Sequence, residues 1–171
     1  MNLVRMTQDY VFGEFDCGDD DLNNFLFEDA KPFLEKSIAN TFILEDGDKI
    51  VAYFSLLTDK ISKLEVTNSQ WKKVKKLFPE GKRFSSYPSI KIGRLAVSKE
   101  YRGQQIGTKM LTAIKAWFSS QQNYAASRFL TVDAYLSAIP FYLNNGFVEL
   151  NQIDEDKHTR LMFLDLMQMK G

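Results

Sequence analysis

The residue types that most often build reactive centres are scarce in this chain. Its 171 residues include one cysteine and one histidine. Cys17 alone cannot form an internal disulfide, which fits a reducing compartment. His158 alone cannot form a histidine pair or a metal cluster. Basic and acidic residues both number 22, so no net charge draws the chain to nucleic acid or to an anionic membrane.

Long apolar runs and linkers are also missing. No apolar run is long enough to span a bilayer, and the opening MNLVRMTQDY lacks the apolar core of a signal peptide. We therefore expect a cytoplasmic protein. No repeat, low-complexity tract or Pro/Gly/Ser linker divides the sequence. With 44% hydrophobic content, residues 1–171 are expected to form one domain.

Apolar periodicity and turn residues predict strands that alternate with helices. Strands are expected at 2–6, 50–57, 89–97, 128–135 and 159–167, and Asp46-Gly47-Asp48 predicts a hairpin turn within 41–61. Helices are expected over 20–30, 68–78 and 106–118 and within 137–147, with Pro32 opening a further short piece. Asp19, Asp20 and Asp21 precede the apolar stripe of the first helix, and Trp117 is expected on the apolar face of the third. Asn145-Gly146 closes the last helix, with Gly146 as its C-terminal cap. The sequence therefore predicts an α/β domain with a sheet of mixed strand direction.

The helix expected over 68–78 carries lysines on one side, and two interpretations are open. Lys72, Lys73, Lys75 and Lys76 could bind RNA phosphates, or they could be the solvated side of an amphipathic helix. The neutral overall charge favours the solvated face.

The most informative segment is VSKEYRGQQIGTKML, residues 97–111, where a strand ends and a helix begins. The first turn of a helix has unpaired backbone N–H groups at the positive end of its dipole. Gly103 and Gly107 let a phosphate approach them, while Arg102 and Thr108 add donors. This favours a pyrophosphate site, although the spacing matches neither the Walker nor the dinucleotide pattern. Alternatively, the glycines only permit a tight turn and close packing.

Two segments resemble the GNAT superfamily of acyltransferases. IGRLAVSKEYRGQQIGTKML resembles its acetyl-CoA motif, with Arg102 at the first position and Gly107 at the last. Gln105 stands where the family usually has glycine. SAIPFYLNNGF is similar to the family's Phe-Tyr-x-x-x-Gly-Phe segment, with Tyr142 at the position of the usual catalytic tyrosine. FDCGDDDLNNFL and YPSIKIGRLAV resemble the branch that contains tRNA-acetylating toxins.

The resemblance implies a single-domain GNAT-like fold, whose mixed, mostly antiparallel central sheet is flanked by helices and splayed around the coenzyme. It implies that Leu95, Ala96 and Val97 serve the pantetheine and thioester of acetyl-CoA, and that Tyr142 protonates the thiolate. No metal is implied. The pyrophosphate would be held by Arg102, Gly103, Gln104, Gln105, Ile106, Gly107 and Thr108.

Three functions follow from this resemblance. The first is direct acetyl transfer from acetyl-CoA to a primary amine of a small molecule or peptide, by a chain that could be a homodimer. The second is a toxin of a toxin–antitoxin pair that acetylates the α-amine of aminoacyl-tRNA, using a basic groove of Lys72, Lys73, Lys75, Lys76, Lys82 and Arg83. The third is a non-catalytic acyl-CoA-binding module in which Gln105 weakens the loop.

Four polar or reactive side chains have plainer interpretations. Tyr142 could be a packing residue between Phe141 and Phe147, although its spacing to Gly146 favours catalysis. Asp133, in an apolar strand, could be a buried base, and we expect it to be structural. His158 is expected at the surface. Cys17 has no neighbouring basic group in the sequence and is expected to be packed.

Overall fold

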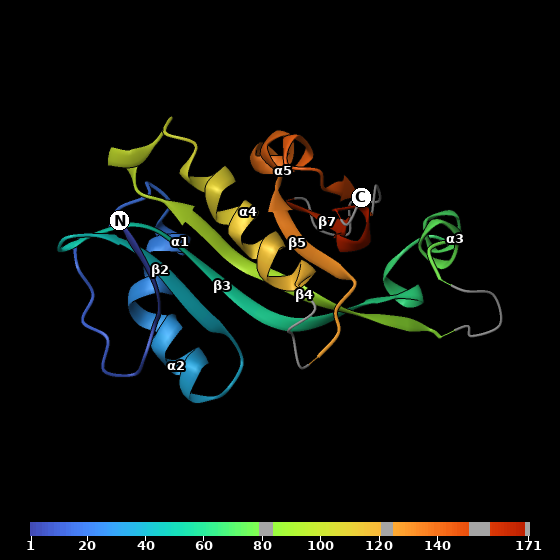
Figure 1. Ribbon diagram of the computed structural model, residues 1–171, viewed down its shortest axis with the longest axis horizontal. Coiled ribbons are helices and arrows are strands. Elements are labelled where there is room, and N and C mark those ends of the chain that lie inside the picture. The colour runs from blue at the N-terminus through green and yellow to red at the C-terminus, as the bar shows by residue number, and fades with distance from the viewer. Residues whose placement is uncertain (79–83, 121–124, 151–157, 170–171) are drawn as a thin grey trace. The chain divides into compact units, whose positions relative to one another are not determined.

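The computed structural model of the chain describes residues 1–78, 84–120, 125–150 and 158–169 (Figure 1). The chain forms two compact units. Unit 1 comprises 1–57 and 92–114, and unit 2 comprises 58–91 and 115–171. Strands β3 (Lys49–Ser62) and β4 (Ser86–Val97) and helix α4 (Ile106–Ser119) run through both units.

Unit 1 contains the strand order β1-β2-β3-β4. Strand β1 (Asn2–Arg5) pairs antiparallel with β2 (Asn40–Asp46), which forms the predicted hairpin with β3. Gly47 takes the turn with a φ of 61°, a conformation that glycine adopts without steric cost. Residues 50–56 of β3 are all buried, as expected for a strand covered on both faces.

One helical stretch runs from Asp20 to Glu35, longer than predicted. It consists of α1 (Asp20–Asn24), a π-helical turn (Phe25–Asp29) and α2 (Ala30–Glu35). Asp19 caps its start by accepting a 3.0 Å hydrogen bond from the Leu22 amide. The prediction that Pro32 opens a separate piece is wrong, because Pro32 lies inside α2. The wider turn before it accommodates the missing proline N–H.

The core of unit 1 forms between this helical stretch and the strands. Phe25, Leu26 and Ala30 pack with Ile43 and Tyr53 at 4% exposure or less. The Tyr53 hydroxyl donates a 2.7 Å hydrogen bond to the Leu22 carbonyl. Burying a large apolar side chain such as Phe25, Leu26 or Ile43 contributes about 1.5–3 kcal/mol to stability. The N-terminal helices are therefore firmly anchored to the sheet.

Unit 2 contains the strand order β3-β4-β5-β7-β6. Its strands β5 (Phe129–Tyr135), β6 (Val148–Glu149) and β7 (Thr159–Asp165) pair antiparallel, and β6 was not predicted. Its helices are α3 (Asn68–Lys75) and α5 (Ile139–Asn144). Shorter 3-10 turns lie at Lys63–Glu65, Leu136–Ala138 and Leu166–Met169 in unit 2, and at Lys99–Tyr101 in unit 1.

An aromatic core fills unit 2 beneath α3. Phe78 stacks on Tyr87 with ring centroids 3.6 Å apart, and Trp71 stacks on the same ring at 5.5 Å.

Unit 2 also contains a buried ion pair. Arg128 donates to both carboxylate oxygens of buried Asp165, at 3.0 and 2.9 Å. This paired geometry offsets the cost of burying the carboxylate.

The predicted fold class is confirmed. The chain has an α/β architecture with a seven-stranded sheet in the order β1-β2-β3-β4-β5-β7-β6. Strand β2 pairs antiparallel with β1 and β3, and β7 pairs antiparallel with β5 and β6. Among the residues that the structure describes, no helix is both long and apolar enough to cross a membrane.

Candidate functional site

The junction between β4 and α4 forms as predicted. The Ser98 amide donates to the Val51 carbonyl at 2.9 Å, which ties the end of β4 to β3. The Lys109 amide donates to the Gln105 carbonyl at 3.0 Å, which marks Gln105 as the residue that caps the start of α4. The amides of Ile106, Gly107 and Thr108 therefore belong to the first turn, where N–H groups lack helical partners.

Two residues of this loop have left-handed backbone conformations. Gly103 has a φ of 78° and Gln105 a φ of 58°. A Cβ built on Gly103 would meet nothing within 4 Å, so the backbone conformation, and not space, favours glycine there. Gln105 adopts a conformation that costs an L-residue about 1–2 kcal/mol. Such conformations shape backbone concavities that bind anions, and they explain why glycine suits position 105.

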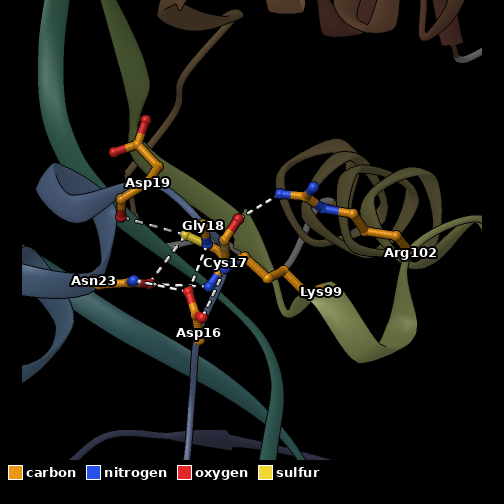
Figure 2. A network of polar contacts seen from close by, with 7 residues as sticks. All are labelled: Asp16, Cys17, Gly18, Asp19, Asn23, Lys99 and Arg102. Carbon is orange, nitrogen blue, oxygen red and sulfur yellow. Dashed lines mark hydrogen bonds and ion pairs between the residues drawn. The ribbon is translucent and has the colours of Figure 1, made fainter.

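Arg102 is held by a contact that the sequence did not reveal. Its Nη2 donates a hydrogen bond to the backbone carbonyl of Cys17, in the loop before α1 (Figure 2). The residue immediately precedes the glycine loop and is exposed. A guanidinium has several N–H donors in a fixed plane, so this bond leaves others for a phosphate.

The strand residues expected to serve the thioester have mixed burial. Ala96 is 5% exposed and belongs to the core of unit 1, with Tyr53 and Phe25. Leu95 and Val97 are half-buried. All three lie at the carboxyl end of β4, directly before the loop, so their backbone groups are near the helix start in the chain.

Tyr142 lies on α5 in unit 2 and is 6% exposed. Its ring packs edge-on against Phe141 and Phe147, with centroids 5.1 and 5.3 Å away. Burial raises the pKa of Tyr142 above its ordinary value, so the hydroxyl keeps its proton at neutral pH. The helix ends at Asn144, and Gly146 follows with a φ of 85°, as predicted for a C-terminal cap.

Lys115 is a buried charged residue that sequence analysis missed. It lies on α4 in unit 2 at 8% exposure, and its Nζ donates a 2.5 Å hydrogen bond to the Asn145 carbonyl. Burial lowers the pKa of Lys115. Trp117, predicted on the apolar face, is 37% exposed. An isolated lysine in the last turns of a helix usually signals a solvated face, so its pattern hid this contact.

Asp133 is neither buried nor isolated. Its carboxylate forms an ion pair with Lys91, with Oδ2 2.5 Å from the lysine Nζ, and its side chain is 47% exposed. Asp59 lies 3.7 Å from the same ammonium. Burial lowers the pKa of Lys91, but the hydrogen bond and charge of Asp133 outweigh it and raise the pKa overall. The ion pair supports the structural interpretation of Asp133 and does not support a buried base.

The only cysteine and histidine have the plain environments expected of them. Cys17 is 4% exposed, its Sγ lies 3.1 Å from Asn23 Oδ1, and burial raises the pKa of its thiol. It therefore lacks the thiolate character of a nucleophile. His158 is exposed just before β7. Among the described residues, no group of three or more His, Cys, Asp or Glu side chains could hold a metal ion.

The lysine-bearing helix forms with a buried apolar side. Trp71 and Val74 are buried, and Lys72, Lys73 and Lys76 are exposed. The helix is therefore amphipathic, and its exposed lysines are compatible with both interpretations. Lys82 and Arg83, which complete the predicted basic groove, lie outside the described residues.

Comparison with known proteins agrees with this geometry. The family model of the acetyltransferase (GNAT) domain matches residues 37–149, which span the hairpin, the β4–α4 junction and Tyr142. A crystal structure of a bacterial toxin is similar, with a TM-score of 0.83, 18% identity, and coverage of 99% of this chain and 92% of that one.

Two further solved structures share the fold. AtaT complexed with acetyl-methionyl-tRNAfMet has a TM-score of 0.79 and 22% identity, covering 99% of this chain and 96% of that one. A tyrosine-to-phenylalanine mutant of KacT has a TM-score of 0.79 and 23% identity, with the same two coverages. The family match covers well over half of the sequence, and the chain belongs to the GNAT family of acetyl-CoA-dependent N-acetyltransferases.

Proposed function

We propose that this chain transfers an acetyl group from acetyl-CoA directly to a primary amine, and that residues 102–108 hold the coenzyme's pyrophosphate. The observation that carries the proposal is the start of α4. The first-turn amides, which have no partner within the helix, lie in one short segment with the left-handed Gly103 and Gln105 and the guanidinium of Arg102. The positive helix end and the guanidinium suit the negative charge of linked phosphates.

The strand before this loop would bind the rest of the coenzyme. Backbone groups of Leu95, Ala96 and Val97 would pair with the pantetheine arm as an added strand does. During transfer, the amine nitrogen attacks the thioester carbon, a C–N bond forms and the C–S bond breaks. An N–H group near Val97 would stabilise the negative oxygen of the tetrahedral state.

Tyr142 would complete the reaction as the general acid. Its buried, protonated hydroxyl gives a proton to the departing thiolate, and the proton released by the amine restores the phenol through solvent. The match to the family's Phe-Tyr-x-x-x-Gly-Phe segment supports this role.

Aminoacyl-tRNA is the acceptor that one specific observation favours. A structure similar to this chain is AtaT with acetyl-methionyl-tRNAfMet, and Lys72 and Lys73 of helix α3 are exposed, as is Lys76 at its C-terminal cap. Lysines on one helix can contact successive phosphates of RNA. With this acceptor, the chain would be the toxin of a toxin–antitoxin pair.

A screen of acceptors tests these proposals. Acetyl transfer from acetyl-CoA would be measured to charged tRNA, polyamines, peptide N-termini, lysine peptides and aminoglycosides. Turnover with any amine supports the enzyme. CoA binding without turnover would instead support the non-catalytic module.

A lysine variant separates the possible acceptors. Replacing Lys72 and Lys73 by Gln should slow acetylation of charged tRNA several-fold and weaken its salt dependence, while leaving transfer to a small amine unchanged. Equal effects on both acceptors would contradict the tRNA-binding role of α3.

A further inference from the structure

The loop before α1 is fastened to the β4–α4 junction by a set of contacts that we call the Asp16 clasp (Figure 2). The carboxylate of Asp16 accepts hydrogen bonds from the Gly18 amide at 2.7 Å, from Asn23 Nδ2 at 3.1 Å and from Lys99 Nζ at 2.8 Å. The backbone closes the same link, because the Lys99 amide donates to the Asp16 carbonyl at 2.9 Å. All of these residues belong to unit 1.

The clasp holds in place an atom that accepts a hydrogen bond from Arg102. That acceptor is the carbonyl oxygen of Cys17, the residue between Asp16 and Gly18. The Cys17 amide in turn donates to Asn23 Oδ1 at 3.0 Å, and Asn23 is itself bonded to Asp16. The peptide that carries the acceptor is therefore held on both sides by groups that depend on the Asp16 carboxylate.

Gly18 lies in contact with two side chains of the junction. Gly18 has a φ of 78°, and a Cβ built on it would lie 2.5 Å from Lys99 Cε and 3.5 Å from Arg102 Nη2. The loop thus lies directly against the side chains of the junction. A side chain that is ordered before binding loses less conformational entropy when a ligand arrives.

From this geometry we infer that Asp16 is a positioning residue for coenzyme binding, which acts by holding Arg102 through the Cys17 carbonyl. The inference rests on the proposed function, since it assumes that Arg102 faces the pyrophosphate. Asp16 lies 86 positions before Arg102 in the sequence, so the coenzyme site would depend on a residue far from the loop. No phosphate contact by Asp16 itself is involved, because a carboxylate repels phosphate.

The test is a comparison of two acetyl donors in Asp16→Ala and Asp16→Asn variants. Asp16→Ala should raise the Kd of CoA, measured by calorimetry, about tenfold, the size expected from loosening one charge-assisted bond. Asp16→Asn keeps an oxygen for the Gly18 amide and should raise the Kd less. S-acetylpantetheine carries no pyrophosphate, so its kcat/KM should stay at the wild-type value in both variants.

Two controls exclude a general structural effect. Glu100→Ala removes an exposed ion pair of similar length, the 2.7 Å contact with Lys49, from the same turn and should leave the Kd of CoA unchanged. In an Arg102→Ala background, Asp16→Ala should add no further loss of CoA affinity, because its effect passes through Arg102.

The outcomes distinguish this inference from the function on which it rests. A wild-type chain that does not bind CoA contradicts both. A wild-type chain that binds CoA, with Asp16→Ala binding equally well, contradicts the inference alone. Parallel losses with acetyl-CoA and S-acetylpantetheine, or additive losses in the double variant, also overturn it, because they indicate general damage to the fold.

Discussion

Lys115 and Asn145 join helix α4 to the end of helix α5 through a 2.5 Å hydrogen bond from the lysine ammonium to the backbone carbonyl. The carbonyl lies one residue beyond α5, the helix that carries Tyr142. A buried lysine at this point satisfies an acceptor that the helix leaves without an internal partner. Within unit 2, this contact links α4 to the C-terminal end of α5.

Replacing Lys115 by Met should destabilise the chain by about 1–3 kcal/mol, because the Asn145 carbonyl loses its buried donor. Urea unfolding followed by circular dichroism measures this change. Lys109→Met, at an exposed position of the same helix, is the matched control and should change stability by less than about 0.5 kcal/mol. If the two substitutions lower the free energy of unfolding equally, the buried hydrogen bond does not contribute to stability as proposed.

Replacing Gln105 by Gly should stabilise the fold by about 0.5–1 kcal/mol, since glycine relieves the left-handed backbone at a smaller entropic cost. Thermal unfolding measures the shift. Gln104→Gly is the control, because Gln104 is not among the described non-glycine residues with a positive φ, which are Ser37 and Gln105. It should destabilise by a similar amount. The account of the loop is wrong if both changes have the same sign.

Replacing Tyr142 by Phe should lower kcat by about 10²- to 10⁴-fold, because the hydroxyl supplies a proton to the leaving thiolate. The Kd of acetyl-CoA should stay nearly unchanged, since the ring packing with Phe141 and Phe147 is retained. Stopped-flow turnover and calorimetry give the two values. A variant with wild-type turnover would remove Tyr142 from the acid role.

The stabilising effect of Asp16 should depend on pH. Its hydrogen bond with Lys99, and then those with Asn23 and Gly18, lower the pKa of Asp16 from 3.8 to about 2. The folded state therefore favours the ionised form, so the stabilisation is complete above pH 3.8 and is lost as the pH falls toward 2. The stability difference between wild type and Asp16→Asn, measured by urea unfolding, should shrink across that window. A difference that is constant with pH would argue against the ion pair.

Local signals were sufficient to predict most of the elements. Gly47 identified the hairpin turn, Asp19 to Asp21 preceded the first helix, and Gly146 ended α5, because each acts on its own neighbours in the chain. The strand β6 was missed because two residues, Val148–Glu149, are too short to show an alternating pattern. The unbroken helix through Pro32 was missed because a π-helical turn leaves no local signal.

The candidate site was predictable only where it is continuous in sequence. The loop 102–108 and the helix start were found from Gly103, Gly107 and the pattern that follows. The bond from Arg102 to Cys17 joins residues 85 positions apart, and that from Lys115 to Asn145 joins residues 30 apart. Contacts of this kind depend on the folded arrangement and have no periodic signature. Whether Tyr142 and the loop serve one reaction stays a prediction.

The central claim is that residues 102–108 bind the coenzyme's pyrophosphate. The most direct test is the Kd of acetyl-CoA for wild type, for Arg102→Ala, and for Lys109→Ala as an exposed control one turn away. We predict a rise of about tenfold or more for Arg102→Ala, the size of a charge-assisted hydrogen bond, and little change for Lys109→Ala. An Arg102→Ala variant that binds acetyl-CoA as tightly as wild type would contradict the claim.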